Sequence, residues 1–246
     1  MLRAEALSKR YGALTVTRDV TLDLARGERR AIIGPNGAGK TTLFNLLGGE
    51  VRPDSGRILF GARDITHSPP DARARAGIAR SFQRNSLFDA LTVRDNLVTA
   101  AAVSTGLGRV FWRPLARFPE LDERAREIAE LVGLADEIDH PASGLAYGAQ
   151  RQLEVGLALA VDPVLLLLDE PTAGMSPDET AAMKALIASL PRALSMLVIE
   201  HDMDVVFDLA DSVTVLDAGA VLFEGTPEQV RASDAVRARY LGEAAP

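Results

Sequence analysis

Between residues 34 and 42 the chain reads Gly34-Pro35-Asn36-Gly37-Ala38-Gly39-Lys40-Thr41-Thr42. This is the spacing of a phosphate-binding loop: a glycine, four residues, and then Gly-Lys-Thr. Residues 30–33 before it predict a short buried strand, and the apolar residues 43–47 predict the helix that follows. An ordinary glycine turn that caps a helix is the alternative, and the agreement between motif and context disfavours it.

The residue types of this loop determine its chemistry. Glycine adopts backbone conformations that a side chain would forbid, so successive N–H groups can turn inward on a phosphate at a helix N-terminus. Lys40 adds a positive charge for the terminal phosphates, and the Thr41 hydroxyl is placed to bind magnesium. The stretch therefore predicts a phosphate site that uses Mg²⁺.

Composition limits the class of protein. The 246 residues suffice for one large α/β domain or for one domain with an inserted subdomain. The chain has no cysteine, which excludes disulfides and thiolate metal sites and fits a reducing compartment. We expect neither a secretion signal nor a transmembrane helix. The formal charge of −7 disfavours a protein that grips nucleic acid backbones, so no nucleic acid is expected among the partners.

Polar residues follow three predicted strands. These strands are predicted over residues 78–82, 164–168 and 195–199. Gln83 follows the first strand, Asp169 and Glu170 follow the second, and His201 lies just after the third. Such strand ends meet the ligand in open α/β sheets, and the upstream phosphate loop makes this the expected place for a magnesium carboxylate. Without that loop, a helix cap or a structural histidine would be the better interpretation.

The sequence pattern changes between residues 84 and 155. Thr92 predicts a helix N-cap with Asp95 in the reciprocal position, and apolar residues recur at helical spacing over 121–131. A glycine-containing turn at 145–149 then leads into another helix. This segment therefore predicts a helical insertion in an α/β scaffold.

The two ends of the chain favour β structure. Residues 1–33 alternate in a β-rich way, and residues 213–224 predict a hairpin, followed by a helix that Thr226 caps. Tyr11 lies in a polar setting, and an exposed aromatic ring there could stack on a nucleobase. From the residue alone, a packing role is the better interpretation, because aromatic rings are more often part of a core.

Taken in order, these motifs resemble the ATP-binding subunit of ABC transporters, and the resemblance covers nearly the whole chain. It implies an α/β fold with a RecA-like P-loop NTPase core, an N-terminal antiparallel β subdomain and an inserted α-helical signature subdomain. The core and the β subdomain are expected over residues 1–83 and 156–246, and the helical subdomain over 84–155. Together they form one nucleotide-binding domain over 1–246.

The resemblance also implies a role for each motif. Tyr11 matches the aromatic residue that stacks on adenine, which replaces the packing interpretation. The implied catalytic residues are Lys40, Gln83, the general base Glu170, and His201, which faces the γ-phosphate. The implied Mg²⁺-binding residues are Thr41, Gln83 and Asp169. The implied ATP-binding residues are Tyr11, Gly34, Pro35, Asn36, Gly37, Ala38, Gly39, Lys40, Thr41, Thr42, Ala146 and Gly148.

The signature turn departs from the family pattern. Most of the family has Leu-Ser-Gly-Gly-Gln, whereas this chain has Leu145-Ala146-Tyr147-Gly148-Ala149. Ala146 lacks the hydroxyl that reaches the γ-phosphate bound by the opposite subunit, a hydrogen bond worth roughly 1.5–3 kcal/mol. Backbone N–H groups and the helix dipole can still meet that phosphate. We therefore expect weakened ATP-driven closure. Ser176 also stands where many relatives have aspartate.

Finer details resemble the ATPases of bacterial importers for branched-chain amino acids, amides or urea. They lie at residues 77–83, 91–96 and 224–227 and at Tyr147. This implies an Mg²⁺-dependent ATPase, peripheral on the cytoplasmic face of the cell membrane. Its implied partners are a second ATP-binding subunit (a copy or a paralogue), transmembrane permease subunits and an extracytoplasmic solute-binding protein.

Two alternatives stay open. One is a soluble regulatory or DNA-maintenance ATPase of the same superfamily, for which tandem nucleotide domains, long coiled coils or basic surfaces would be expected. The other is a weakly hydrolytic nucleotide-binding subunit paired with a paralogue, which Ala146 suggests.

Overall fold

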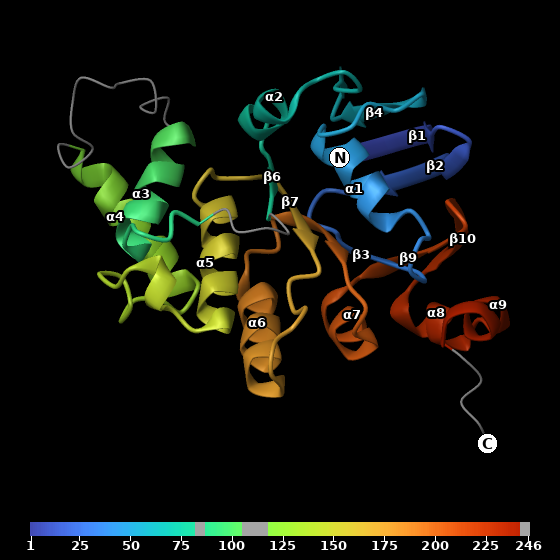
Figure 1. Ribbon diagram of the computed structural model, residues 1–246. Helices are drawn as coiled ribbons and strands as arrows, with labels where there is room; N and C mark the ends of the chain where they lie inside the picture. The colour runs from blue at the N-terminus through green and yellow to red at the C-terminus, as the bar shows by residue number, and fades with distance from the viewer. Residues whose placement is uncertain (82–86, 105–117, 242–246) are drawn as a thin grey trace. The chain divides into compact units, whose positions relative to one another are not determined.

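The computed structural model describes residues 1–81, 87–104 and 118–241 (Figure 1). By its internal contacts the chain divides into two compact units, which are described separately below. The first comprises Met1–Arg73, Leu167–Glu170 and Pro191–Pro246. The second comprises Ala74–Leu166 and Pro171–Leu190.

An antiparallel sheet forms the amino-terminal part of the first unit. Its strands, in the order β2-β1-β4-β5, are β1 (Leu2–Tyr11), β2 (Leu14–Leu24), β4 (Ser55–Phe60) and β5 (Arg63–Asp64). Leu2 pairs with Leu24, and Ala4 pairs with Leu22. These side chains are buried while their neighbours in sequence are more exposed, as a half-buried strand requires. The predicted N-terminal antiparallel β subdomain is confirmed.

A second sheet places the strand ends that carry the predicted site. Its order is β10-β9-β3-β8-β7-β6. The first unit holds β3 (Arg29–Ile33), β8 (Ser195–Ile199), β9 (Ser212–Asp217), β10 (Ala220–Gly225) and the end of β7 (Leu165–Asp169). Strand β3 is parallel to β8 and β9, and all its residues are buried, which fits a central strand. The predicted hairpin is confirmed, because β9 and β10 pair antiparallel.

The helices of the first unit are α1 (Lys40–Gly48), α7 (Met203–Leu209), α8 (Pro227–Ala232), α9 (Asp234–Val236) and η4 (Arg237–Leu241). Two of them, α1 and α8, follow the phosphate loop and Thr226 as predicted, whereas the others were not predicted. Thr226 caps α8 by accepting a hydrogen bond from the Gln229 N–H, as predicted. Valines of β9, α7 and α8 pack on Ala31 and Ile33 of β3. This core holds the strand that leads into the phosphate loop.

The second unit is mostly helical. It contains β6 (Ile78–Arg80), α3 (Val93–Ser104), α4 (Pro119–Leu131), η3 (Ala142–Gly144), α5 (Tyr147–Leu159), α6 (Pro177–Ser189) and the beginning of β7, while α2 (Pro70–Arg75) crosses the boundary in sequence. The predicted cap is confirmed, because the Thr92 hydroxyl accepts from the Asp95 N–H and donates to its carboxylate. Among the described residues, no helix is both long and apolar enough to cross a membrane.

Candidate functional site

The phosphate loop joins β3 to α1, as predicted. Gly39 precedes the helix in the left-handed conformation, with φ of 97°, and its carbonyl accepts the first helical hydrogen bond from the Leu43 N–H at 2.9 Å. Inside the loop the Ala38 N–H donates to the Pro35 carbonyl at 3.1 Å. No side chain caps α1. The positive end of the helix dipole is therefore directed at whatever anion lies in the loop.

Two glycines of the loop are required by close backbone approaches. A Cβ on Gly34 would lie 2.2 Å from the Leu216 carbonyl oxygen, and a Cβ on Gly39 would lie 2.5 Å from that of Val16. Both glycines also have positive φ, at 152° and 97°. The strands beside the loop thus leave no room for side chains at these two positions, where the loop can present only backbone.

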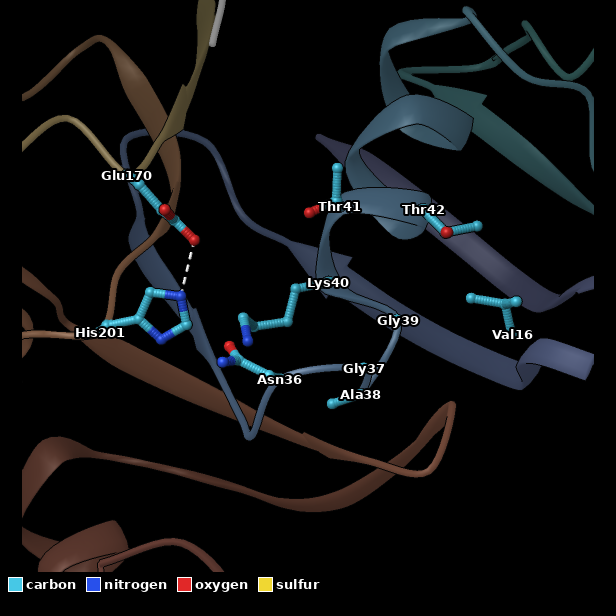
Figure 2. A pocket seen from close by; sticks show the side chains of 10 residues that line it. All are labelled: Val16, Asn36, Gly37, Ala38, Gly39, Lys40, Thr41, Thr42, Glu170 and His201. Atoms are coloured by element: carbon cyan, nitrogen blue, oxygen red, sulfur yellow. Dashed lines mark hydrogen bonds and ion pairs between the residues drawn. The ribbon is translucent and has the colours of Figure 1, made fainter. Parts of the chain in front are cut away.

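A pocket of about 200 Å³ opens over the loop (Figure 2). It is lined by Val16, Asn36, Gly37, Ala38, Gly39, Lys40, Thr41, Thr42, Glu170 and His201. Loop residues and two strand-end residues predicted from the sequence therefore share one cavity within the first unit. Val16 was not predicted, because it is an ordinary apolar residue of β2 and only the pairing of that strand brings it to the loop.

The Lys40 ammonium lies within the loop. It donates hydrogen bonds to the carbonyls of Gly34 at 2.6 Å and Pro35 at 3.0 Å. Burial lowers the pKa of Lys40, and the nearby carboxylates of Glu170 and Asp169 oppose that shift. A phosphate oxygen carries negative charge and would be a stronger acceptor for this ammonium than these two neutral carbonyls.

Glu170 and His201 point toward each other on one side of the pocket (Figure 2). His201 Nε2 lies 2.6 Å from Glu170 Oε1, and the imidazole donates to this carboxylate in the tautomer that carries its proton on Nε2. Glu170 follows β7 with φ of 50°, a left-handed conformation that costs an ordinary residue about 1–3 kcal/mol. Its N–H donates to the Ile199 carbonyl at 2.9 Å, a bond that holds this conformation against the end of β8.

Asp169 is the last residue of β7 and is 3% exposed. Among the residues that the structure describes, no group of three His, Cys, Asp or Glu side chains could hold a metal by itself. The Thr41 hydroxyl and the Asp169 carboxylate are nonetheless hard oxygen donors. They suit Mg²⁺, which binds through one or two carboxylates and keeps most of its ligands as water and phosphate oxygens. The donor set therefore fits a magnesium ion that arrives with a nucleotide.

The remaining predicted residues lie apart from this pocket lining. Tyr11 ends β1 with 48% exposure, and the Lys9 ammonium lies 5.7 Å from its ring centroid. Ala146 and Gly148 lie at the start of α5 in the second unit. Gln83 falls outside the described residues.

Sequence reasoning missed Arg73, which anchors the far end of α1. Its side chain is 1% exposed, and burial lowers the pKa of its guanidinium. The guanidinium donates to the carbonyls of Leu46, Leu47, Ser68, Ile65 and Thr66, at 2.6–3.2 Å. Two of these carbonyls belong to the last turn of α1, where helical acceptors lack intrahelical donors. A single arginine on a polar helix gives no sequence signal of this kind.

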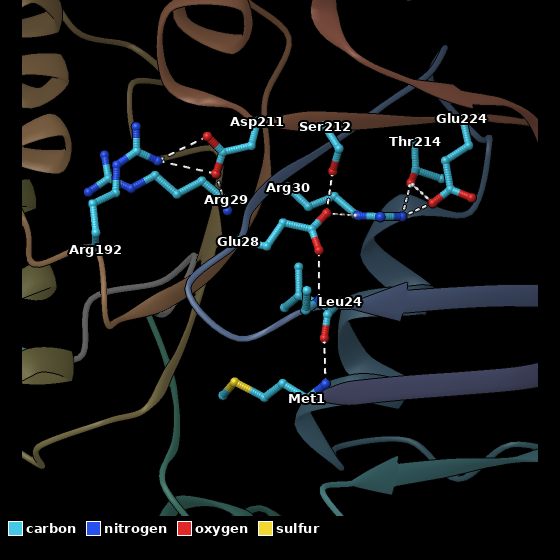
Figure 3. Close-up of polar contacts among 11 residues, drawn as sticks. Met1, Leu24, Glu28, Arg29, Arg30, Arg192, Asp211, Ser212, Thr214 and Glu224 are labelled. Atoms are coloured by element: carbon cyan, nitrogen blue, oxygen red, sulfur yellow. Dashed lines mark hydrogen bonds and ion pairs between the residues drawn. The ribbon is translucent and has the colours of Figure 1, made fainter.

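A second charged cluster holds the start of β3, at the other end of the strand from the phosphate loop (Figure 3). Arg30 is 9% exposed and pairs with Glu28 at 2.9 Å and with Glu224. It also donates to the Thr214 hydroxyl at 3.3 Å. Beside it, the Arg29 N–H donates to Asp211 at 2.9 Å. Both ends of the strand–loop–helix unit are therefore fixed by buried arginines.

Fold and site together define a phosphate-loop nucleotide-binding ATPase. A family model described as "ABC transporter" matches residues 17–173. The chain is 39% identical to the high-affinity branched-chain amino acid transport ATP-binding protein LivG of Escherichia coli (strain K12), over 99% of this chain and 98% of that one. It is equally similar to BraF of Pseudomonas aeruginosa, at 39% identity over 251 residues. The chain therefore belongs to the ABC transporter family of ATPases.

Other relatives widen the comparison. The lipopolysaccharide export system ATP-binding protein LptB of Haemophilus influenzae is 36% identical over 99% of this chain and 98% of its own. Among solved structures, the ADP conformation of MJ1267, an ATP-binding cassette of an ABC transporter, superimposes with a TM-score of 0.87 at 30% identity, covering 99% of each chain. The predicted family and the α/β cassette fold are confirmed.

Proposed function

We propose that this chain is the ATP-hydrolysing subunit of an importer, and that two such subunits close head to tail on ATP to drive uptake of a branched-chain amino acid or a related small solute. The observation that carries the proposal is the pocket in which the phosphate loop faces the Glu170–His201 pair. The likeness to LivG and BraF supports the class of solute.

In this proposal each side chain has a defined task. Tyr11 stacks on adenine, while the loop N–H groups and Lys40 hold the β- and γ-phosphates. Glu170 takes the proton of the attacking water, and the His201 N–H orients the Glu170 carboxylate and faces the γ-phosphate. The 2.6 Å contact between Glu170 and His201 supports this division of roles.

Thr41, Asp169 and Gln83 would hold a magnesium ion at this site. When bound, the ion supplies positive charge that neutralises the developing charge on the transferred phosphate.

The proposal requires more than one subunit. Backbone N–H groups of the turn that contains Ala146 and Gly148 meet the γ-phosphate bound by the opposite subunit, which is a second copy or a paralogue. Permease subunits receive the closing motion through the helical subdomain over 84–155. An extracytoplasmic solute-binding protein delivers the solute to the outer face of the permease. The chain itself works at the opposite, cytoplasmic face of the membrane.

Hydrolysis by the purified chain tests the catalytic part. We expect Mg²⁺-dependent ATP turnover that falls at least about 100-fold in Glu170→Gln, since a general base contributes roughly 10²–10⁴-fold. Glu228→Gln removes a carboxylate from the first turn of α8, outside the pocket lining, and serves as the matched control. Turnover unaffected by Glu170→Gln would exclude Glu170 as the base. Ala146→Ser is expected to strengthen ATP-driven dimerisation.

The direction of transport needs its own experiment, because the likeness to LptB favours export as a second candidate. We would introduce Glu170→Gln into the gene in its own host and measure uptake of radiolabelled leucine, isoleucine and valine. Lost uptake supports the importer. Normal uptake together with a defective outer envelope would instead assign the chain to export.

A further inference from the structure

Helix α5 begins without a cap of its own. Its N-cap residue is Ala146, which has no side-chain acceptor, and its first turn carries no acidic residue. The Gly148 N–H, one of the free donors of that first turn, donates instead to Glu179 Oε1 at 2.9 Å. Glu179 belongs to α6 of the same unit, so the neighbouring helix supplies the acceptor that Ala146 lacks.

The same carboxylate also caps its own helix. Glu179 Oε2 accepts from the Ser176 N–H at 2.9 Å, and the Ser176 hydroxyl accepts from the Glu179 N–H at 3.3 Å. This reciprocal pair is a capping box at the start of α6. One side chain therefore joins the signature turn to the turn at residues 171–176, which precedes α6.

Tyr147 makes a second link between these two turns. Its hydroxyl donates to the Ala173 carbonyl at 3.0 Å and accepts from Arg151 Nε at 3.0 Å. The Arg151 guanidinium also lies over the ring, 5.3 Å from its centroid, and pairs at 2.8 Å with Glu154, which is 6% exposed. The phenol is thus fixed from both sides.

Two glycines show how closely the turns are packed. A Cβ on Gly148 would lie 2.7 Å from Glu179 Oε1, inside van der Waals contact. Gly174 has φ of 77°, and a Cβ there would lie 3.4 Å from the Tyr147 hydroxyl. The Glu179 carboxylate therefore occupies the space that a side chain at Gly148 would take, and the Tyr147 phenol lies within van der Waals contact of Gly174.

We propose that Tyr147 and Glu179 are positioning residues. Their hydrogen bonds hold the signature turn and the 171–176 turn together, so that the two turns move as one rigid unit. This inference rests on the proposed function, because there the signature turn contacts the γ-phosphate that is bound by the opposite subunit. Phosphate contact at the signature turn is then transmitted to the 171–176 turn through the Glu179 carboxylate and the Tyr147 phenol.

The link itself is tested on the nucleotide-free chain by hydrogen–deuterium exchange of backbone amides. Tyr147→Phe removes only the hydroxyl and keeps the ring. Neither the Gly148 nor the Ser176 N–H is hydrogen-bonded to the Tyr147 hydroxyl, so faster exchange at both amides indicates that the two links act together. Unchanged exchange at both overturns the proposal. The phosphate-loop amides, which belong to the first unit, should exchange as in the wild type.

Dimer closure tests the consequence. In a Glu170→Gln background, we expect Tyr147→Phe and Glu179→Ala each to weaken ATP-driven dimerisation about fivefold, the size expected for one or two lost hydrogen bonds. Glu179→Gln keeps only one of the two acceptor oxygens, so one of the two hydrogen bonds is lost and dimerisation should fall between that of the parent and that of Glu179→Ala. Asp178→Ala removes a carboxylate from the same first turn and is the matched control. ATP affinity of the monomer should be the same throughout.

Two results overturn the positioning role: dimerisation unaffected by Tyr147→Phe and Glu179→Ala, or an equal loss in Asp178→Ala. A parent chain that binds ATP without dimerising would instead refute the proposed function, and the exchange of Gly148 and Ser176 would still decide whether the turns are linked.

Discussion

His201 Nε2 lies 2.6 Å from Glu170 Oε1, although the two residues follow different strands and are separated by 31 positions in sequence. Neither side chain is fully buried, with 41% and 28% of their surfaces exposed. The contact brings a proton donor to the carboxylate that we propose as the general base. It therefore fixes which way that carboxylate points.

Replacing His201 should slow hydrolysis without weakening ATP binding to the monomer. Loss of a hydrogen bond to a charged group costs about 1.5–3 kcal/mol, so His201→Ala should lower kcat about 10- to 100-fold. His201→Gln keeps an N–H donor and should recover part of that loss. Steady-state kinetics with mant-ATP binding separates the two effects, and a weaker mant-ATP affinity with normal kcat would contradict the orienting role.

Gly34→Ala should destabilise the phosphate loop. The added Cβ would lie 2.2 Å from the Leu216 carbonyl oxygen at a positive φ, and we expect a loss of about 2–4 kcal/mol in the free energy of unfolding. Urea denaturation measures it. Gly144→Ala is the control, because nothing lies within 4 Å of its Cβ position and its φ is not positive. Equal stability of both variants would show that the loop can relax.

Arg73→Met should cost at least about 3 kcal/mol, because it leaves five carbonyl groups without their charged donor. Arg73→Lys keeps the charge but not the branched set of donors. Its stability should therefore lie between that of the wild type and that of Arg73→Met. The exposed Arg52 provides a control in Arg52→Met. Chemical denaturation followed by circular dichroism gives the values, and a loss below 1 kcal/mol would mean that water replaces the guanidinium.

Tyr11→Ala should weaken ATP binding by about 1–3 kcal/mol, the range measured for base–aromatic stacking. Tyr11→Phe keeps the ring and should bind ATP as the wild type does. Inorganic triphosphate, which has no base, should bind all three proteins alike. Equal losses for ATP and triphosphate would place the defect in the phosphate loop instead.

The pH dependence of stability should contain a contribution from Glu179. Hydrogen bonds from the Ser176 backbone, the Ser176 side chain and the Gly148 N–H lower the pKa of Glu179 from its ordinary value of 4.5. The folded state therefore favours the ionised form, so this stabilisation is complete above pH 4.5 and is lost as the pH falls through the lowered pKa. Glu179→Gln should flatten the acid side of the stability curve. Identical slopes for both proteins below pH 4.5 would contradict this.

The sequence alone predicted the elements that depend on local pattern. The loop at residues 34–42, the buried strand before Asp169, the β-hairpin near the C-terminus and the Thr226 cap each follow from neighbouring residues and are present. Resemblance added the family, which the comparisons confirm. The individual roles of the site residues stay predictions.

Tertiary structure decided what depends on distant parts of the chain. The burial of Arg73, the position of Val16 beside the loop and the contact of Tyr147 with Ala173 have no local signal. Each requires two segments that only the folded backbone brings within hydrogen-bonding or packing distance. Periodicity and spacing report which conformation a segment prefers, whereas these contacts depend on strand order and helix packing, which set the distances between segments.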